Sequence, residues 1–159
     1  MSRWMPIFVG LVITLFISKV SLAQTISTLA GDGTAGFSGD GGSATSASLN
    51  APTGMFVDGS GNLFIADRMN SRIRQVDAAG IINTVAGDIT FGFSGDGGPA
   101  TGASLNAPSS VFVDGSGTIF IADAFNHRIR QVDAAGIIST VVGGWYRRLL
   151  GGWGTGDQC

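Results

Sequence analysis

The sequence is poor in the residues that build exposed helices. It contains no glutamate, its only lysine is Lys19, and charged residues make up 13% of its 159 residues. Glutamate and lysine are good helix formers and common on exposed helix faces, so their scarcity argues against long surface helices and coiled coils. Hydrophobic residues still make up 44% of the chain, which excludes the weakly hydrophobic, highly charged composition of a disordered protein.

Cysteine and histidine are almost absent. Cys159 is the only cysteine, so an internal disulfide is impossible. His127 is the only histidine, and no Gly-x-Ser-x-Gly sequence accompanies it, which argues against a Ser-His-Asp site and against a histidine-based zinc site. We expect His127 to be an exposed turn residue, and we predict no catalytic, cofactor-binding or metal-binding residues.

Glycine, by contrast, is abundant, at 26 of 159 residues. The glycines have no three-residue period, which excludes collagen. Together with many Asp, Val, Ile and Phe residues they predict strands joined by tight turns. Residues 24–144 contain ten aspartates and five arginines, a net charge of −5, and this acidity argues against a nucleic-acid partner.

Residues 1–23 have the pattern of a secretory signal peptide. Arg3 supplies a charged start, residues 6–17 are largely apolar, and small residues precede a cleavage site after Ala23. The alternative is a membrane anchor, but a helix needs about 20 apolar residues to span a bilayer, and Lys19 interrupts this run. We therefore predict a secreted or periplasmic protein that has no membrane association after cleavage.

The chain contains an internal duplication with a period of 56 residues. Residues 26–81 align without gaps with residues 82–137, with 42 identities in 56 positions, and a third copy begins at Ile138. Each repeat contains four short apolar runs separated by turns rich in Asp, Gly and Asn; in the first they are residues 55–57, 63–66, 73–76 and 81–86. The runs are apolar on both faces, so both faces should be covered.

Four antiparallel strands per repeat, stacked face to face, describe a β-propeller blade. We predict an all-β, incomplete propeller of two blades plus one extra strand at Thr25–Gly31, with one helical turn within residues 44–49 and again within 100–105. The predicted order is a signal peptide at 1–23, a strand plus Gly-rich loop at 24–53, blade 1 at 54–87, a Gly-rich loop at 88–109, blade 2 at 110–143, and an off-pattern tail at 144–159.

A spaced polar motif recurs once per repeat: Asp67, Asn70 and Arg72, then Asp123, Asn126 and Arg128. An aspartate after a strand can accept bonds from turn amides, and an arginine can reach a neighbouring carboxylate or carbonyl. A catalytic set normally occurs once, whereas a device that holds a blade together recurs with the blade. We interpret these six residues as a structural motif.

The motif resembles the core of NHL repeats. The Asn50-Ala51-Pro52 sequence and the pattern Val57-Asp58-x-x-Gly61-Asn62 also fit, and the Gly-Phe-Ser-Gly-Asp-Gly-Gly loop is similar to the long-loop NHL units of exported bacterial proteins and of teneurins. This resemblance implies a β-propeller, usually six-bladed, that serves as a binding platform.

Two loop motifs suggest ligands that we reject. Residues 31–36 spell Gly-x-Gly-x-x-Gly, but the following Phe-Ser-Gly-Asp-Gly-Gly cannot begin the helix that a dinucleotide site needs, and Ile89 replaces the middle glycine in the second copy. Asp32 and Asp40, like Asp88 and Asp96, supply too few oxygens for calcium. We expect these aspartates to form turns.

The tail after Gly144 matches nothing upstream. Shifting its reverse translation by one base allows it to read Gly-Thr-Ala-Gly-Phe-Ser-Gly-Asp-Gly-Gly-Pro-Ala-Thr-Ser-Ala, which is the repeat's own loop in the correct register. Our hypothesis is a one-base frameshift, either real in the gene or an error in the sequence record, that truncates a longer repeat protein. The nucleotide sequence tests it.

The function predicted from sequence is non-catalytic: part of an exported NHL propeller that binds protein or glycan ligands, or acts as a scaffold, through residues that the sequence does not identify. Two alternatives remain, a fragment of a lyase-type or lactonase-type propeller enzyme whose catalytic blades are missing, and a non-functional truncated gene product. Two blades leave open edges and apolar faces, so we expect the isolated chain either to be marginally stable or to associate with copies of itself.

Overall fold

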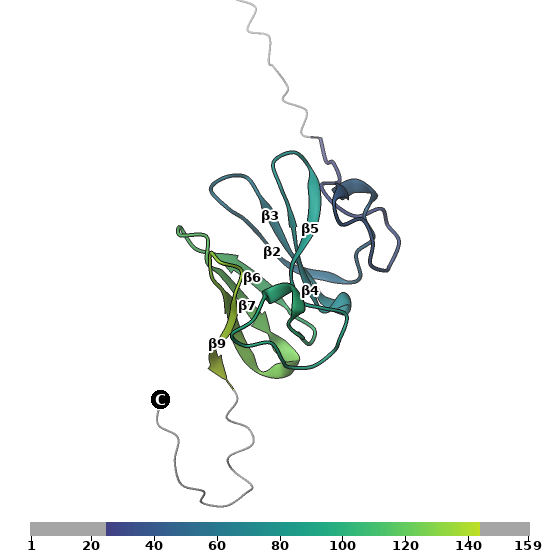
Figure 1. Cartoon of the computed structure of the whole chain (residues 1–159). Coiled ribbons are helices and arrows are strands. Elements are labelled where there is room, and N and C mark those ends of the chain that lie inside the picture. The colour runs from purple at the N-terminus through teal and green to yellow at the C-terminus, as the bar shows by residue number, and fades with distance from the viewer. Residues whose placement is uncertain (1–24, 144–159) are drawn as a thin grey trace, which may run out of the picture.

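The structure is a computed structural model in which residues 25–143 are described (Figure 1). Two antiparallel sheets lie face to face, one for each repeat, which confirms the all-β fold of two four-stranded blades. Blade 1 contains β2 (Pro52–Val57), β3 (Leu63–Asp67), β4 (Arg72–Val76) and β5 (Ile81–Ala86). Blade 2 contains β6 (Ser110–Val113), β7 (Ile119–Asp123), β8 (Arg128–Val132) and β9 (Ile138–Gly143). Neighbouring strands of each blade follow one another in the sequence.

Aspartates build the hairpin turns. The Oδ1 atom of Asp58 accepts hydrogen bonds from the backbone N–H groups of Ser60 at 2.9 Å and Asn62 at 2.8 Å. Asp77 makes the same pair of bonds in the turn between β4 and β5. Such side-chain bonds to the backbone two residues ahead explain why aspartate is common in these turns.

The extra strand predicted at Thr25–Gly31 is absent there, which corrects that expectation. A strand needs a partner that takes up its backbone groups, and no strand of the β4 type lies beside this segment within residues 25–143. The additional strand is instead β1 (Gly42–Ser43), which pairs with β5 at the outer edge of blade 1.

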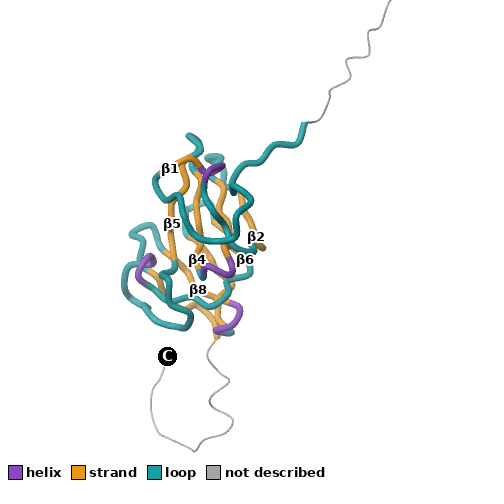
Figure 2. The backbone as a smooth tube through the Cα atoms, turned by 90° about the vertical axis from the view of Figure 1, so that its right-hand side faces the viewer, coloured by secondary structure: helices purple, strands orange, loops and turns teal. Residues whose placement is uncertain are grey.

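The expected helical turns are present as short 3-10 helices, η1 (Ala44–Ser46) and η3 (Ala100–Gly102). Figure 2 shows how little helix the chain contains among its strands and loops. Two further 3-10 turns, η2 (Arg68–Asn70) and η4 (Ala124–Asn126), connect the second and third strands of each blade. None of the helices within residues 25–143 is long and apolar enough to cross a membrane.

The main hydrophobic core lies between the blades. Phe64, Ala66 and Ile73 of blade 1 pack against side chains of blade 2 that are almost fully buried, namely Val111, Val113, Ile119, Ile121, Val132 and Ile138. A second, smaller cluster around Leu63, Ile65 and Val76 lies on the opposite face of blade 1. Each blade thus uses one face of its sheet for the core between them.

Candidate binding surface formed by the long loops

Each repeat begins with a long connection that we call long loop 1 (residues 31–51) and long loop 2 (residues 87–107). The two loops follow the same path, because the N–H of Gly31 donates to the carbonyl of Ala44 at 2.9 Å and the N–H of Gly87 donates to Ala100 at the same distance. Gly39 shows why the loop sequence is glycine-rich. Its φ is +87°, and a Cβ there would lie 2.6 Å from the Cβ of Ala47, so glycine alone fits without strain.

A buried aspartate anchors each long loop to its blade. Asp67 ends β3 and is fully buried. Its Oδ1 accepts the backbone N–H of Asn50 at 2.7 Å, and its Oδ2 accepts the side-chain amide of Asn70 at 2.8 Å. The same Asn70 amide donates to the loop carbonyl of Gly36 at 2.7 Å. Asp67 and Asn70 therefore attach two points of long loop 1, at Gly36 and Asn50, to one corner of blade 1.

A buried arginine holds the middle of the loop. Arg74 lies on β4 with no exposed surface, and its guanidinium donates to the carboxylate of Asp40 at 2.7 Å and to the carbonyl of Ser38 at 3.0 Å. It also lies 3.4 Å from the Oδ2 of Asp67. We call Asp67, Asn70 and Arg74 with their loop partners the loop clamp. Buried charges need such partners, since an unpaired one is very costly.

An aromatic side chain of the loop completes the clamp. The guanidinium carbon of Arg72 lies 3.7 Å from the centre of the Phe37 ring, and that of Arg74 lies 4.7 Å from it. Stacking on an aromatic face is a favourable position for a guanidinium group. Arg72 also donates to the carbonyl of Asn70 at 3.5 Å.

Blade 2 repeats the loop clamp. Arg130 reaches Asp96 at 2.7 Å and Asp123 at 3.5 Å, and the guanidinium of Arg128 stacks 3.7 Å from the centre of the Phe93 ring. Asn126 donates to Asp123 at 2.7 Å and to the carbonyl of Gly92 at 2.6 Å.

The structure therefore brings the six motif residues together with residues that the sequence analysis missed. In blade 1 the carboxylate of Asp67 is paired with Arg74, two residues beyond the arginine of the motif. Arg74 could have been found from its spacing, because side chains two residues apart share one face of a strand and Arg74 therefore lies on the same side as Arg72. The repeated Phe-Ser-Gly-Asp sequence supplies its counter-charge.

Burial raises the pKa of Asp67, because desolvation disfavours the charged carboxylate; the Asn70 amide, the Asn50 N–H and Arg74 oppose that effect. Asp32, in contrast, has a lowered pKa, chiefly because the backbone N–H of Thr34 donates to it. The turn role predicted from the sequence is confirmed for Asp32 and Asp88, which accept the backbone N–H two residues ahead. For Asp40 and Asp96 it is corrected, because their carboxylates pair with the buried arginines Arg74 and Arg130. No group of three or more His, Cys, Asp or Glu side chains within residues 25–143 is placed to hold a metal ion.

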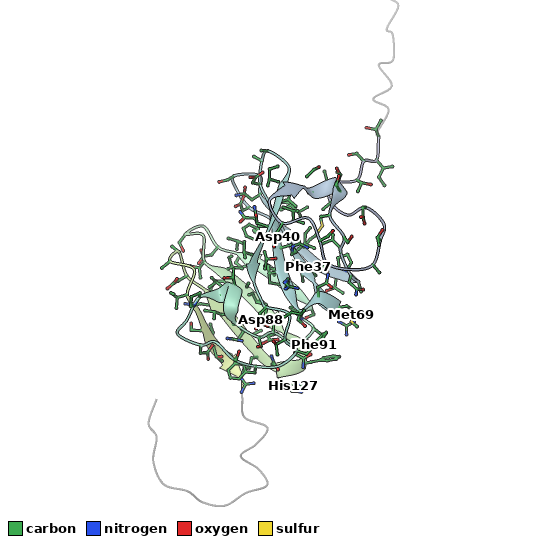
Figure 3. All side chains as sticks on the ribbon, turned by 45° about the vertical axis from the view of Figure 1, so that its right-hand side comes forward. Phe37, Asp40, Met69, Asp88, Phe91 and His127 are labelled. Carbon is green, nitrogen blue, oxygen red and sulfur yellow. The ribbon has the colours of Figure 1, made fainter. Side chains whose placement is uncertain are left out.

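The two long loops run next to each other on one side of the molecule, and between them lies an open hollow of about 430 Å³. It is lined by Phe37, Asp40, Arg72, Thr84, Gly87, Asp88, Ile89 and Thr101. Figure 3 shows Phe37 and Asp40 of long loop 1 and Asp88 and Phe91 of long loop 2 in this region. The hollow combines an aromatic ring, an arginine and two carboxylates.

Long loop 2 is the more apolar of the two. Ile89 is 78% exposed and Phe91 is 61% exposed, whereas the first copy has Gly33 and Ala35 at these positions. Exposed apolar side chains on a loop that is held rigidly below are typical of a binding surface. His127 is exposed, as expected, and forms the left-handed end of η4.

Two four-stranded blades that share a core, each with a clamped loop, define a β-propeller repeat protein. The Teneurin NHL domain family matches this chain over residues 29–94 and 91–150, and the chain belongs to that family. Human teneurin-4 is 40% identical over 102 residues and mouse teneurin-1 is 39% identical over 102 residues. These matches cover 56% of this chain but only 4% of each teneurin.

The fold has solved counterparts. A Bacteroides thetaiotaomicron protein of unknown function is 30% identical, with a TM-score of 0.51 over 62% of this chain and 24% of that protein. A putative phosphatase from the same organism has the same TM-score at 21% identity, covering 72% of this chain and 26% of its own, and shows the fold alone. The matched part of this chain thus corresponds to about a quarter of each of these solved chains.

Proposed function

We propose that this chain is a non-catalytic, exported binding module whose long loops present a ligand-binding surface for an extracellular protein or glycan. The observation that carries the proposal is the combination of Ile89 and Phe91, which are exposed, with a loop clamp that fixes the loop bearing them. A rigid loop loses little conformational entropy on binding, so exposed apolar groups on it contribute more of their burial to affinity.

The chemistry of the surface favours ligands that have both an apolar face and polar groups. Ile89 and Phe37 supply apolar contact in the hollow, while Arg72, Asp40 and Asp88 supply charged groups beside them. Sugars and protein loops both combine such features, whereas nucleic acid needs a basic surface. The export proposal rests on the pattern of residues 1–23, which lie outside the described residues.

The experiment uses long loop 1 as a built-in control. In the double variant Ile89→Gly with Phe91→Ala, long loop 2 receives the residues that the first copy has at these positions, so the backbone path should persist. We would probe the wild-type chain and this variant on an array of defined oligosaccharides and on a panel of purified extracellular protein domains. We expect one or more ligands to bind the wild type and to lose at least tenfold in affinity for the variant. Equal binding by both chains would contradict the proposal.

A further inference from the structure

Each blade has one outward side, which does not contact the other blade. The equivalent side of the other blade is buried in the core between the two blades. The leading face is the side of blade 1 that points away from blade 2. It carries Met55 and Val57, which are exposed, and Leu63 and Ile65, which are buried in the smaller cluster with Ala44 and Ala47. The trailing face is the side of blade 2 that points away from blade 1, and it carries Phe120, Ala122, Ile129 and Val142. The 56-residue repeat relates the first set to Val111, Val113, Ile119 and Ile121, and the second to Phe64, Ala66, Ile73 and Ala86.

On the leading face, the exposed fraction differs sharply from that of the equivalent position at Met55 and Val57. Met55 is 68% exposed, whereas Val111 is 4% exposed because blade 1 covers it. Val57 is 52% exposed, and the identical Val113 is 5% exposed. A chain of this kind normally buries such contiguous apolar groups.

The trailing face shows the same contrast. Ile129 is 38% exposed, whereas the identical Ile73 is completely buried against blade 2. Val142 is 61% exposed, and its counterpart Ala86 is completely buried.

The leading face is also hollowed. An open depression of about 310 Å³ lies over Met55, Leu63 and Ile65, beside the Thr28–Ala30 segment. At the equivalent place on blade 2 the side chains of Phe64, Ala66 and Ile73 fill the space. The depression therefore has the position of a neighbouring blade of this repeat.

We propose that the trailing face of one copy packs on the leading face of a second copy, in the same way that blade 1 packs on blade 2. The two faces carry the residues that already fit each other within the chain, because five of the eight positions are identical between repeats and the other three are apolar in both. Such a head-to-tail contact forms a ring when its rotation closes. Propellers have about four to eight blades, so two blades per copy give a ring of about two to four copies.

The outermost strands determine how the copies meet. Each copy holds three segments of the outer-strand sequence, residues 26–31, 82–87 and 138–143, whereas the described residues 25–143 form two blades. β5 and β9 already pair with β4 and β8, whereas Thr25–Ala30 has no strand partner. In the ring, β9 keeps its place and the Thr25–Ala30 segment of the next copy moves aside.

One position makes the contact between copies looser than the contact within the chain. A Cβ on Gly54 would lie 2.6 Å from the Cα of Ser110, so the two blades approach closely at a position where blade 1 has no side chain. At the contact between copies, the trailing blade has Ser110 at the position equivalent to Gly54. Its Cβ holds the two backbones farther apart, so Ser110→Gly should strengthen association.

The test begins with the molar mass of the purified chain, measured by light scattering over a range of concentrations. A closed species of two to four copies supports the proposal, and a chain that stays monomeric and melts cooperatively at high concentration overturns it. Val57→Glu places a charge on the leading face and Val142→Glu places one on the trailing face. Circular dichroism of dilute samples checks that both variants remain folded.

Mixing the two variants tests the head-to-tail geometry. Each variant keeps one intact face, so each alone should be monomeric, whereas an equimolar mixture should form one-to-one dimers and nothing larger. A mixture that stays monomeric overturns the proposal, as does either variant dimerising alone through like faces.

Two further variants sharpen the arrangement. Ser110→Gly should lower the dissociation constant about tenfold, because relief of overpacking at one contact is worth that much. Thr28→Pro should leave association unchanged, since residue 28 moves aside in the ring. Loss of association in Thr28→Pro would overturn the assignment of β9 as the retained strand.

Discussion

Blade 1 and blade 2 have nearly the same sequence, yet they differ in what covers them. The ion pairs and hydrogen bonds that their loop clamps share have the same lengths to within a few tenths of an ångström, and in blade 2 Arg130 also donates to the carbonyl of Ser104 at 3.5 Å. Their faces do not match, because each blade is covered by the other on one side only. The comparison shows that the clamp is a property of the single repeat, whereas burial of the apolar faces depends on the neighbouring blade.

Substitutions in the loop clamps are expected to cause the largest losses of stability. Arg74→Leu removes the cation that pairs with Asp40 and Asp67, and Arg130→Leu does the same in blade 2. Because each change leaves a buried carboxylate without its counter-charge, we expect a loss of about 3–5 kcal/mol in the free energy of unfolding, equal in both blades. Urea unfolding measures it.

Arg68→Leu is the matched control for the clamp variants. Its guanidinium lies 5.4 Å from the centre of the Phe125 ring and has no part in the clamp, so we expect a loss below about 1 kcal/mol. A loss of similar size for Arg68→Leu and Arg74→Leu would show that the loop clamp does not stabilise the fold more than an arginine outside the clamp does.

The apolar faces of the blades predict a loss of stability that is intermediate in size and differs between equivalent positions. Val113→Ala removes two buried methyl groups from the core between the blades, for an expected loss of about 2–3 kcal/mol. Val57→Ala changes the identical residue on the open leading face and should cost less than about 0.5 kcal/mol in dilute solution. Equal losses in the free energy of unfolding, measured by urea unfolding at the same low protein concentration, would contradict the different burial of Val113 and Val57.

The close approach of the two blades at Gly54 predicts a loss of stability of similar or smaller size. Gly54→Ala places a Cβ 2.6 Å from the Cα of Ser110, so we expect overpacking that costs about 1–3 kcal/mol. Gly59→Ala is the control, because a Cβ there meets no atom within 4 Å. Thermal unfolding should separate the two variants clearly, and identical melting temperatures would contradict the packing described between the blades.

The smallest predicted effect is a pH dependence with opposite signs at two aspartates. The side chain of Asn62 lowers the pKa of Asp58, so the stability that Asp58 contributes is present above its unfolded value of 3.8 and is lost as the pH falls through the folded value. Burial raises the pKa of Asp67, so its contribution is present below 3.8 and is lost as the pH rises through the folded value.

Urea unfolding of two asparagine variants from about pH 3 to about pH 7 measures how the stability contributed by each aspartate depends on pH. The deficit of Asp58→Asn relative to the wild type should shrink as the pH falls, whereas the deficit of Asp67→Asn should shrink as the pH rises. Deficits that change in the same direction would contradict the different environments of the two carboxylates.

Much of the fold could be predicted from the sequence because its signals are local or repeated. Tight turns depend on Asp and Gly residues near each other, and the 56-residue period marked the blades without any knowledge of contacts. The predicted strand at Thr25–Gly31 was wrong because strand formation depends on a partner, and an outer-strand sequence beside no β4-like strand stays unpaired.

The site was harder to predict. Asp67, Asn70 and Arg72 were recognised from spacing, but the role of Arg74 depends on Asp40, which lies 34 residues away on a loop. The sequence alone shows that Ile89 and Phe91 differ from the residues of the first copy. Only the structure shows that both side chains are exposed and that Ile89 lines the hollow between the loops.

The most direct test of the account is the reactivity of a cysteine placed at each of two equivalent positions. In a Cys159→Ser background, Val57→Cys and Val113→Cys report on the leading face and on the core between the blades. We predict that a thiol at position 113 reacts slowly at every protein concentration, whereas a thiol at position 57 is protected at high concentration and becomes reactive on dilution. Equal reactivity of the two thiols at all concentrations would contradict the account.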